Sequence, residues 1–247
     1  MKNINNWKPT KYVWDKDKLV ASGNSQYVNI GSRVMVDAIA RYYGKYLPDY
    51  AMGKLLDLGC GHVPLFDVYR NHVSDIVCVD WDNTRHKNQF LDLTHDLTEK
   101  LPFEDKEFDT IILSDVLEHI PNPNELCDEI ARVLAPGGVL IMNVPFLYWL
   151  HETPHDYYRY TEYSLRRFMR EMGLETQLLE PIGGVAEVLT DIISKLFAST
   201  GTPGKVISKT MHSGFKLFGR TKVAKRISDK TKSIFPLGYF LIAKKTN

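Results

Sequence analysis

The sequence predicts an α/β fold: a Rossmann-like, doubly wound sheet of seven mostly parallel strands, with the last strand antiparallel. From residue 54 onward, short apolar runs alternate with polar turns and helical stretches, a pattern typical of βαβ units around a buried parallel sheet. A glycine-rich turn at residues 59–61 directly follows the first of these runs. The length of 247 residues and the 44% hydrophobic content suit one globular domain with an appendage.

Periodicity and turn residues place the individual elements. A helix is expected from about residue 31 to 43, where apolar residues recur at helical spacing. Asn122 and Thr161 are expected to cap two further helices, over 123–134 and 161–172. The expected strands are 54–58, 76–79, 90–91, 108–113, 139–144, 174–179 and 235–243. The resulting parts are an N-terminal helical segment (1–50), a core (51–183 and 235–247) and a basic helical insertion or lid (184–234).

Several classes of protein are disfavoured by composition. The three cysteines, Cys60, Cys78 and Cys127, are too few and too scattered for a disulfide framework or a cysteine metal clip, so no metal site is predicted. The first residues lack the apolar core of a signal peptide. An uncharged stretch at 133–151 is divided by proline and glycine, which argues against a membrane span. We therefore expect a cytoplasmic protein.

The glycine turn predicts a nucleoside site. Asp80, at the end of the second strand, stands 21 positions after Gly59 and can accept both hydroxyls of a ribose. A dinucleotide would need backbone N–H donors at its pyrophosphate, but Pro64 removes one of them and Asp57 adds a repelling charge. The same acid suits the cationic S-adenosylmethionine, which is therefore favoured over NAD. A plain helix-entry turn with solvated acids is the alternative.

Three runs of residues together resemble the class I S-adenosylmethionine-dependent methyltransferases. The runs are Leu-Leu-Asp-Leu-Gly-Cys-Gly (55–61), Phe-Asp-Thr-Ile-Ile-Leu-Ser-Asp-Val-Leu-Glu-His-Ile-Pro (108–121) and Ala-Arg-Val-Leu-Ala-Pro-Gly-Gly-Val-Leu-Ile (131–141). The resemblance covers roughly residues 50–180 and the last strand. It implies that the methionyl part of the cofactor lies against Asp57, Gly59, Cys60 and Gly61. The sequence departs from this family at Val63-Pro64, where many members have another glycine.

The resemblance also implies the remaining cofactor contacts. Asp80 would hold the ribose, and Trp81 would pack on the adenine. Asp92 and Leu93 would lie at the adenine edge. Ser114 and Asp115, which end the fourth strand, would face the methyl group. Simpler alternatives are that Trp81 packs at the sheet edge and that Asp92 caps a helix or turn.

The segment 145–161, which follows the fifth strand, is predicted to bind the methyl acceptor. It is rich in aromatic residues and belongs to the sheet edge where open α/β folds bind substrates. A histidine suits the removal of a proton from an acceptor, so His151 and His155 are the candidate bases. His119, Tyr157 and Arg159 are the candidate substrate contacts.

That segment has other interpretations. It could be a structural clasp in which His155 bonds the backbone or Asp156, and His119 could be a structural histidine. The run His-Asp-Tyr-Tyr-Arg-Tyr-Thr (155–161) resembles bacterial methyltransferases of cell-surface polysaccharide or lipid-linked glycan pathways. The resemblance implies a small-molecule or glycan-like acceptor.

The insertion is strongly basic. Residues 191–247 carry 12 Lys and Arg against 2 Asp and Glu, whereas residues 1–190 carry 19 against 28. Apolar residues at helical spacing alternate there with lysines and arginines, among them Lys216, Arg220, Lys222 and Lys225. Such a segment can lie on an anionic membrane or receive a lipid-linked substrate. A lid that packs its apolar stripe on the domain and an RNA-binding surface are the alternatives.

The predicted function is methyl transfer from S-adenosylmethionine to an oxygen or nitrogen of a small-molecule or glycan-like acceptor. The alternatives are a non-catalytic peripheral membrane or scaffold protein that keeps the nucleoside fold, and an RNA methyltransferase. DNA is not an expected partner. The expected location is the cytoplasm, including the inner membrane surface if the insertion binds lipid.

Overall fold

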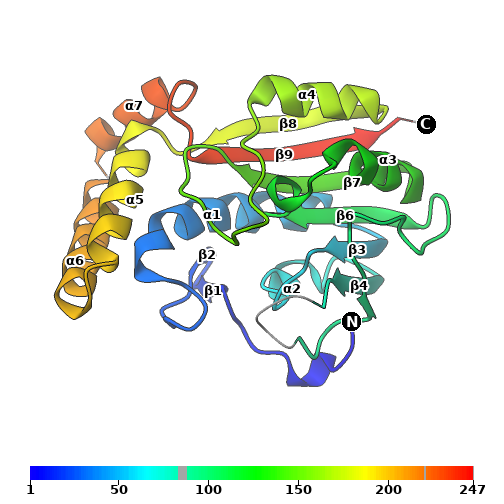
Figure 1. Cartoon of the computed structure of the whole chain (residues 1–247), viewed down its shortest axis with the longest axis horizontal. Coiled ribbons are helices and arrows are strands. Elements are labelled where there is room, and N and C mark those ends of the chain that lie inside the picture. Colours follow the sequence, from blue (N-terminus) through cyan, green and yellow to red (C-terminus); the bar gives the residue numbers. More distant parts are fainter. Residues whose placement is uncertain (83–87, 220, 247) are drawn as a thin grey trace.

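A seven-stranded sheet forms the centre of the computed structural model, which describes residues 1–82, 88–219 and 221–246 (Figure 1). The strand order is β5-β4-β3-β6-β7-β9-β8. β9 runs antiparallel to both of its neighbours, and the other neighbouring pairs are parallel, as predicted. The strands are β3 (Lys54–Leu58), β4 (Asp75–Asp80), β5 (Leu93–Thr94), β6 (Phe108–Ser114), β7 (Leu134–Pro145), β8 (Leu174–Ile182) and β9 (Gly238–Lys245).

Helices cover both faces of the sheet, as a doubly wound fold requires. Leu55 belongs to the core cluster on the side of α1 and α2, and its neighbour Leu56 to the cluster on the side of α3 and α4. Successive side chains of a strand point to opposite faces, so each strand supplies both cores. The helices are α1 (Arg33–Tyr50), α2 (Phe66–Tyr69), α3 (Pro123–Val133) and α4 (Glu162–Glu171).

The N-terminal segment differs from the helical prediction. It contains a hairpin, β1 (Tyr12–Asp15) and β2 (Lys18–Ala21), and two short 3-10 helices, η1 (Ile4–Asn6) and η2 (Ile30–Ser32), before α1. The hairpin buries Tyr12, Leu19 and Ala21 in the same core cluster as α1. The expected helix at 31–43 is present but extends to Tyr50.

The third strand also differs from its prediction. Phe90 is buried in the core, and the ladder with β4 begins only at Leu93, which pairs with Val79. β7 begins at Leu134, directly after α3, but its ladder with β6 passes from Leu134 to Val139 with a register shift, and Gly137 has a φ of +74°. The strand at 90–91 was therefore wrong, whereas regular pairing does start at residue 139, after an irregularity at the predicted turn.

The two predicted helix caps have different outcomes. The Thr161 side chain accepts a hydrogen bond from the Ser164 N–H, which confirms it as the cap of α4. Asn122 stands at the cap position of α3, but its side chain makes no capping bond.

Three helices form the insertion after β8: α5 (Val185–Ala198), α6 (Thr202–Phe218) and α7 (Lys222–Thr231). They lie beyond the carboxyl ends of β7 and β8, in yellow to orange in Figure 1. α5 buries Val188, Asp191, Ser194 and Lys195. It exposes Leu189 (53%), Ile192 (54%) and Leu196 (63%) instead.

The orientation of α5 contradicts the alternative of a lid that packs its apolar stripe on the domain. Apolar side chains of α6 and α7, including Val206, Leu217 and Val223, are also exposed. Within the described residues, no helix combines the length and apolar character needed to cross a membrane. Arg220, one of the predicted basic residues, lies outside the described residues.

Candidate cofactor and acceptor site

The glycine loop follows β3 and bends back over the tip of β4. The backbone N–H groups of Gly59 and Cys60 both donate to the carbonyl of Val79, at 2.9 and 3.1 Å. Gly59 has a φ of +66°, and a Cβ built there would lie 2.5 Å from Cγ2 of Val116. Only glycine satisfies both the backbone angle and this close approach.

Asp80 ends β4 and is tied to the same loop. Its carboxylate accepts hydrogen bonds from the Gly61 N–H (2.8 Å) and the Trp81 N–H (2.8 Å). Burial raises the pKa of Asp80, although these two bonds oppose the shift. The Asp80 carboxylate is therefore held against the glycine turn.

Asp57 is a buried acid beneath the loop. The Tyr69 hydroxyl donates to its Oδ2 at 3.0 Å. Burial raises the pKa of Asp57 to about 7, against the opposing effect of the Tyr69 hydrogen bond. A cationic ligand group at this place would relieve the cost of burying the charge. At the departure from the family pattern, Val63 itself has a φ of +50°, a value that favours glycine.

The tip of β6 carries a polar network around the buried Asn143. The hydroxyls of Ser114 and Tyr43 donate to Asn143 Oδ1, at 2.8 and 2.7 Å, and the Asn143 amide donates to Asp115. Lys11 Nζ lies 3.0 Å from Asp115 Oδ2. Ser114 and Asp115 are thus adjacent at the sheet edge. Lys11, Tyr43 and Asn143 were missed because nothing local in the sequence marks them as partners.

Asp92 and Leu93, the residues predicted at the adenine edge, lie beside β4. The Asp92 carboxylate accepts a hydrogen bond from the Cys78 N–H (2.8 Å) and lies 2.9 Å from the Met1 amine. Leu93 pairs with Val79, one position before the tip of β4. These contacts hold Asp92 against β4 and the N-terminus.

His95 follows β5 and contacts the end of β4. Its N–H donates to the Asp80 carbonyl at 2.9 Å. Its Nε2 is buried and has no hydrogen-bond partner among the described residues. Trp81 contacts the acceptor segment, with its ring centroid 5.1 Å from that of His155 in an edge-to-face arrangement.

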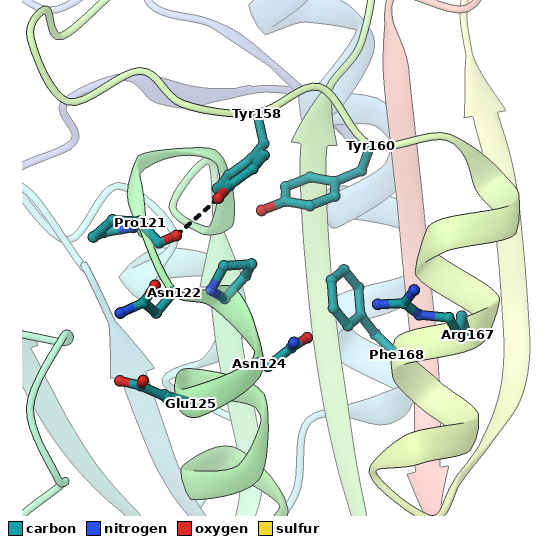
Figure 2. Close-up of a pocket in the computed structure, with 9 residues that line it drawn as sticks. Pro121, Asn122, Asn124, Glu125, Tyr158, Tyr160, Arg167 and Phe168 are labelled. Atoms are coloured by element: carbon teal, nitrogen blue, oxygen red, sulfur yellow. Dashed lines mark hydrogen bonds between the residues drawn. The ribbon is translucent and has the colours of Figure 1, made fainter.

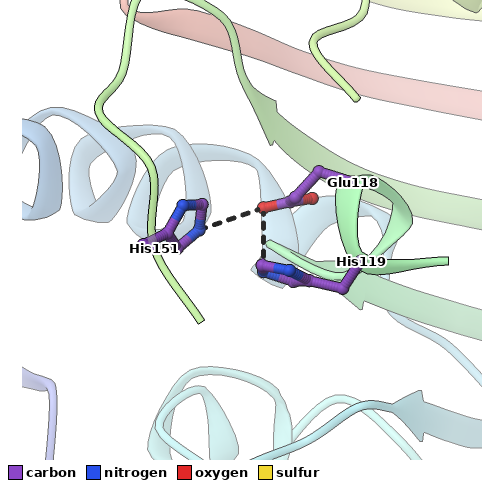
Figure 3. Close-up of side chains that lie close together, drawn as sticks. All are labelled: Glu118, His119 and His151. Atoms are coloured by element: carbon purple, nitrogen blue, oxygen red, sulfur yellow. Dashed lines mark ion pairs between the residues drawn. The ribbon is translucent and has the colours of Figure 1, made fainter. Parts of the chain in front are cut away.

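A carboxylate and two histidines converge just beyond β6 (Figure 3). Glu118 belongs to the short helix η3 (Leu117–His119), and its side chain is 0% exposed. Its Oε1 lies 3.6 Å from His119 Nε2 and 3.7 Å from His151 Nε2. Neither carboxylate oxygen has a hydrogen-bond partner among the described residues, and burial raises the pKa of Glu118.

The acceptor segment is organised around Asp156. Its carboxylate accepts two hydrogen bonds from the Arg159 guanidinium (2.5 and 2.8 Å) and one from the His151 N–H (2.9 Å). Despite the opposing effect of burial, these bonds lower the pKa of Asp156. Asp156 does anchor a clasp, but its partners are His151 and Arg159 and do not include the expected His155.

The other histidines of the site are linked through the same segment. His119 Nδ1 lies 2.6 Å from the His155 carbonyl oxygen, and the Tyr157 N–H donates to the Glu118 carbonyl at 2.9 Å. His155 Nδ1 lies 3.3 Å from the Tyr157 hydroxyl. The structure therefore brings His119, His151 and His155 together and turns Arg159 toward Asp156.

A hollow of about 360 Å³ lies beside this segment, between the start of α3 and α4 (Figure 2). Tyr158 and Tyr160 line it, and the Tyr158 hydroxyl donates to the Pro121 carbonyl at 2.8 Å. None of the predicted site residues lines this hollow.

Sequence comparison matches the central part of the chain to a known family. Residues 56–142 match the family described as "Methyltransferase domain". A Mycolicibacterium smegmatis protein named "probable S-adenosylmethionine-dependent methyltransferase" is 27% identical over 96 residues, 37% of each chain. A Mycobacterium sp. protein named "uncharacterized methyltransferase" is 35% identical over 78 residues, 30% of each chain. The alignments thus span about a third of these relatives.

Solved structures share the fold over most of the chain. A Galdieria sulphuraria protein named as a candidate sarcosine dimethylglycine methyltransferase has a TM-score of 0.57 at 17% identity, covering 93% of this chain and 91% of that one. An S-adenosylmethionine-dependent methyltransferase of Archaeoglobus fulgidus has a TM-score of 0.55 at 17% identity, covering 85% and 93%.

The strand order and the glycine loop after β3 are those of a Rossmann-like α/β fold. Over about a third of its length, the chain is similar to S-adenosylmethionine-dependent methyltransferases.

Proposed function

We propose that the chain transfers a methyl group from S-adenosylmethionine to an oxygen or nitrogen of a small-molecule acceptor held beside Glu118, His119 and His151. The observation that carries the proposal is the position of this buried cluster. It begins three residues after Asp115, at the tip of the strand next to the glycine loop. Cofactor-binding and proton-handling groups therefore share one edge of the sheet.

The described residues fit the cofactor. Asp57 offers a buried negative charge for the methionyl ammonium, and Asp80 offers carboxylate oxygens for the ribose. When bound, S-adenosylmethionine supplies the methyl carbon: the acceptor's lone pair bonds to it, the carbon–sulfur bond breaks with its electron pair left on sulfur, and the acceptor's proton passes to a histidine. The chain itself orients the acceptor and takes that proton.

Two histidines are candidates for the base. His151 is oriented by Asp156, whose Oδ2 lies 3.3 Å from its Nδ1. His155 contacts Trp81, beside the predicted adenine site. General-base removal costs about 10²–10⁴-fold in rate, so the substitution that removes the base has a large effect on kcat.

The proposal is tested by binding first and turnover second. Calorimetry with S-adenosylhomocysteine is expected to show one site per chain. Asp80→Asn is expected to weaken it by about 10–100-fold, because a hydrogen bond to a charged group contributes about 1.5–3 kcal/mol. No binding to the folded wild-type chain would contradict the proposal.

Turnover is then measured with amines, sugar nucleotides and lipid-linked saccharides as acceptors. Of His151→Asn and His155→Asn, the variant that lacks the base is expected to lose about 10²–10⁴-fold in kcat while it keeps its affinity for S-adenosylhomocysteine. His72→Asn, an exposed histidine after α2, is the matched control. Cofactor binding without turnover on every acceptor would favour the non-catalytic alternative.

We further propose that the acceptor is glycan-like or lipid-linked and is met at an anionic membrane surface. The sequence of the 155–161 segment supports the acceptor class. The inverted α5, with Leu189, Ile192 and Leu196 exposed, supports the surface. Apolar side chains next to lysines are the combination that binds anionic bilayers, and the described lysines of α6 and α7 that are exposed are Lys205, Lys209, Lys216, Lys222, Lys225 and Lys230.

Flotation with vesicles tests this surface. Wild-type protein is expected to float with phosphatidylglycerol-containing vesicles and not with phosphatidylcholine alone. The triple variant Lys216→Gln/Lys222→Gln/Lys225→Gln is expected to bind about 100-fold more weakly, since each lysine near the surface contributes about 1 kcal/mol. Ile192→Ser should also weaken binding. Self-association without flotation, or salt-sensitive retention on RNA alone, would contradict the membrane proposal.

A further inference from the structure

We propose that Glu118, His119 and His151 bind one divalent transition-metal ion. The binding itself does not depend on methyl transfer; only the role of the ion rests on the proposed function. The three side chains come from η3 and from the acceptor segment and point at one place (Figure 3). Their ligand atoms all lie within 4.8 Å of one another.

The spacing suits a common ion. Metal–nitrogen and metal–oxygen distances near 2.1 Å place neighbouring ligand atoms about 3.0–3.4 Å apart. Glu118 Oε1 lies 3.6 Å from His119 Nε2 and 3.7 Å from His151 Nε2. The ligand atoms of the three residues are within 4.8 Å of one another, so an ion requires side-chain rotations that bring the most distant pair about 1.4 Å closer.

The surroundings orient the His119 imidazole for this purpose. Nδ1 of His119 lies 2.6 Å from the His155 carbonyl oxygen. A proton on this Nδ1 faces the carbonyl and leaves the Nε2 lone pair directed at Glu118, the arrangement in which backbone carbonyls support metal-binding histidines. His151 is held through its backbone N–H, which donates to Asp156, and its Nδ1 lies 3.3 Å from the same carboxylate without a hydrogen bond. Asp156 is in turn held by Arg159.

The buried carboxylate needs a partner. Glu118 is fully buried, and both of its oxygens lack a hydrogen bond among the described residues. An ionised carboxylate in such a place costs several kcal/mol unless a charge compensates it. Two neutral imidazole lone pairs add no compensation, whereas a divalent cation satisfies all three groups.

The donor set selects the class of ion. Two imidazole nitrogens and one carboxylate suit Mn²⁺, Fe²⁺, Co²⁺ or Zn²⁺, while Mg²⁺ prefers oxygen ligands alone. Three protein ligands leave coordination positions for an acceptor oxygen. An ion there would lower the pKa of an acceptor hydroxyl.

Metal binding is measured on the full-length chain after removal of metals with EDTA. Mn²⁺ is the probe because it avoids the thiols of Cys60, Cys78 and Cys127, and the loss of its free electron paramagnetic resonance signal reports binding. One Mn²⁺ per chain is expected, with Mg²⁺ a poor competitor. Glu118→Gln, His119→Asn and His151→Asn are each expected to weaken binding at least 10-fold.

Two further variants test residues that contact the proposed ligands but do not bind the ion themselves. Asp156→Asn is expected to weaken Mn²⁺ binding about 10–100-fold, as loss of an outer partner does. His155→Asn is the matched control and should bind as wild type, since its backbone carbonyl, not its ring, contacts His119. Thermal unfolding and S-adenosylhomocysteine binding verify that each variant is folded.

Two results would overturn the metal site. One is no Mn²⁺ or Zn²⁺ binding to wild type at millimolar ion; the other is binding that the three ligand variants leave unchanged. Either result with intact S-adenosylhomocysteine binding would reject the ion and keep the methyltransferase proposal. If the wild-type chain does not bind S-adenosylhomocysteine, only the methyltransferase proposal is rejected.

Discussion

The sheet edge and the insertion both bury carboxylates, but only the insertion pairs its buried carboxylate with a lysine. Asp57 and Glu118 are buried at the edge, and no lysine or arginine side chain is recorded in contact with either among the described residues. In the insertion, the buried Asp191 forms an ion pair with Lys195, whose Nζ also lies 3.4 Å from the Tyr148 ring centroid. A buried acid that already has its cation serves structure. One that lacks it is ready for a charged ligand.

Apolar side chains show the same contrast in two helices. α3 buries Leu126 and Ile130, while α5 exposes Leu189 and Ile192. The first helix contributes to the core, and the second keeps its apolar face available. The sheet edge thus has buried carboxylates without a cation, whereas the insertion has apolar side chains that no other part of the described structure covers.

The largest effect is expected from a substitution that breaks the ion pair of the insertion. Lys195→Met leaves Asp191 buried without a cation, so the free energy of unfolding should fall by about 3–5 kcal/mol. Asp57→Asn, which removes an unpaired acid, should leave the unliganded protein unchanged or more stable at pH 7.5. Urea unfolding measures both, and equal losses would erase the distinction between the two regions.

The next effect compares the two helices. Leu126→Ala in α3 should destabilise the protein by about 2–5 kcal/mol, because it opens a cavity in the core. Ile192→Ala in α5 should change stability by no more than about 0.5 kcal/mol, because its side chain is half exposed. A large loss from Ile192→Ala would mean that the apolar side of α5 is buried.

The smallest effect is a pH dependence at the sheet edge. Burial raises the pKa of Asp57 to about 7, so its stabilising contribution in the unliganded protein is complete below its ordinary pKa and is lost as pH rises through 7. A cofactor ammonium prefers the ionised acid. Affinity for S-adenosylhomocysteine should therefore rise about tenfold, or about 1.4 kcal/mol, from pH 6 to pH 8.

Calorimetry between pH 6 and pH 8 checks whether the affinity for S-adenosylhomocysteine rises with pH. Asp57→Asn should flatten the profile, and any slope that remains would report Asp80, whose pKa burial also raises. An affinity that falls with pH in the wild type would contradict the assignment of Asp57 to the ammonium.

The cofactor side could be predicted from sequence more fully than the acceptor side. Gly59 and Asp80 stand at the ends of neighbouring strands, so their proximity follows from local patterns once the strands are placed. The weak third strand was misplaced by three residues because its ladder with β4 has only two pairs. Glu118 is not among the predicted site residues, since no local signal in the sequence shows that a buried glutamate lacks a partner.

By itself, the sequence determined the parallel sheet, the glycine turn and the basic character of the insertion, because periodicity, backbone freedom and charge are local properties. Only the tertiary structure decided that Lys11 meets Asp115 across 104 residues, that Glu118 meets His151, and that α5 turns its polar side inward. Those contacts depend on how distant segments pack, which no short stretch of sequence encodes.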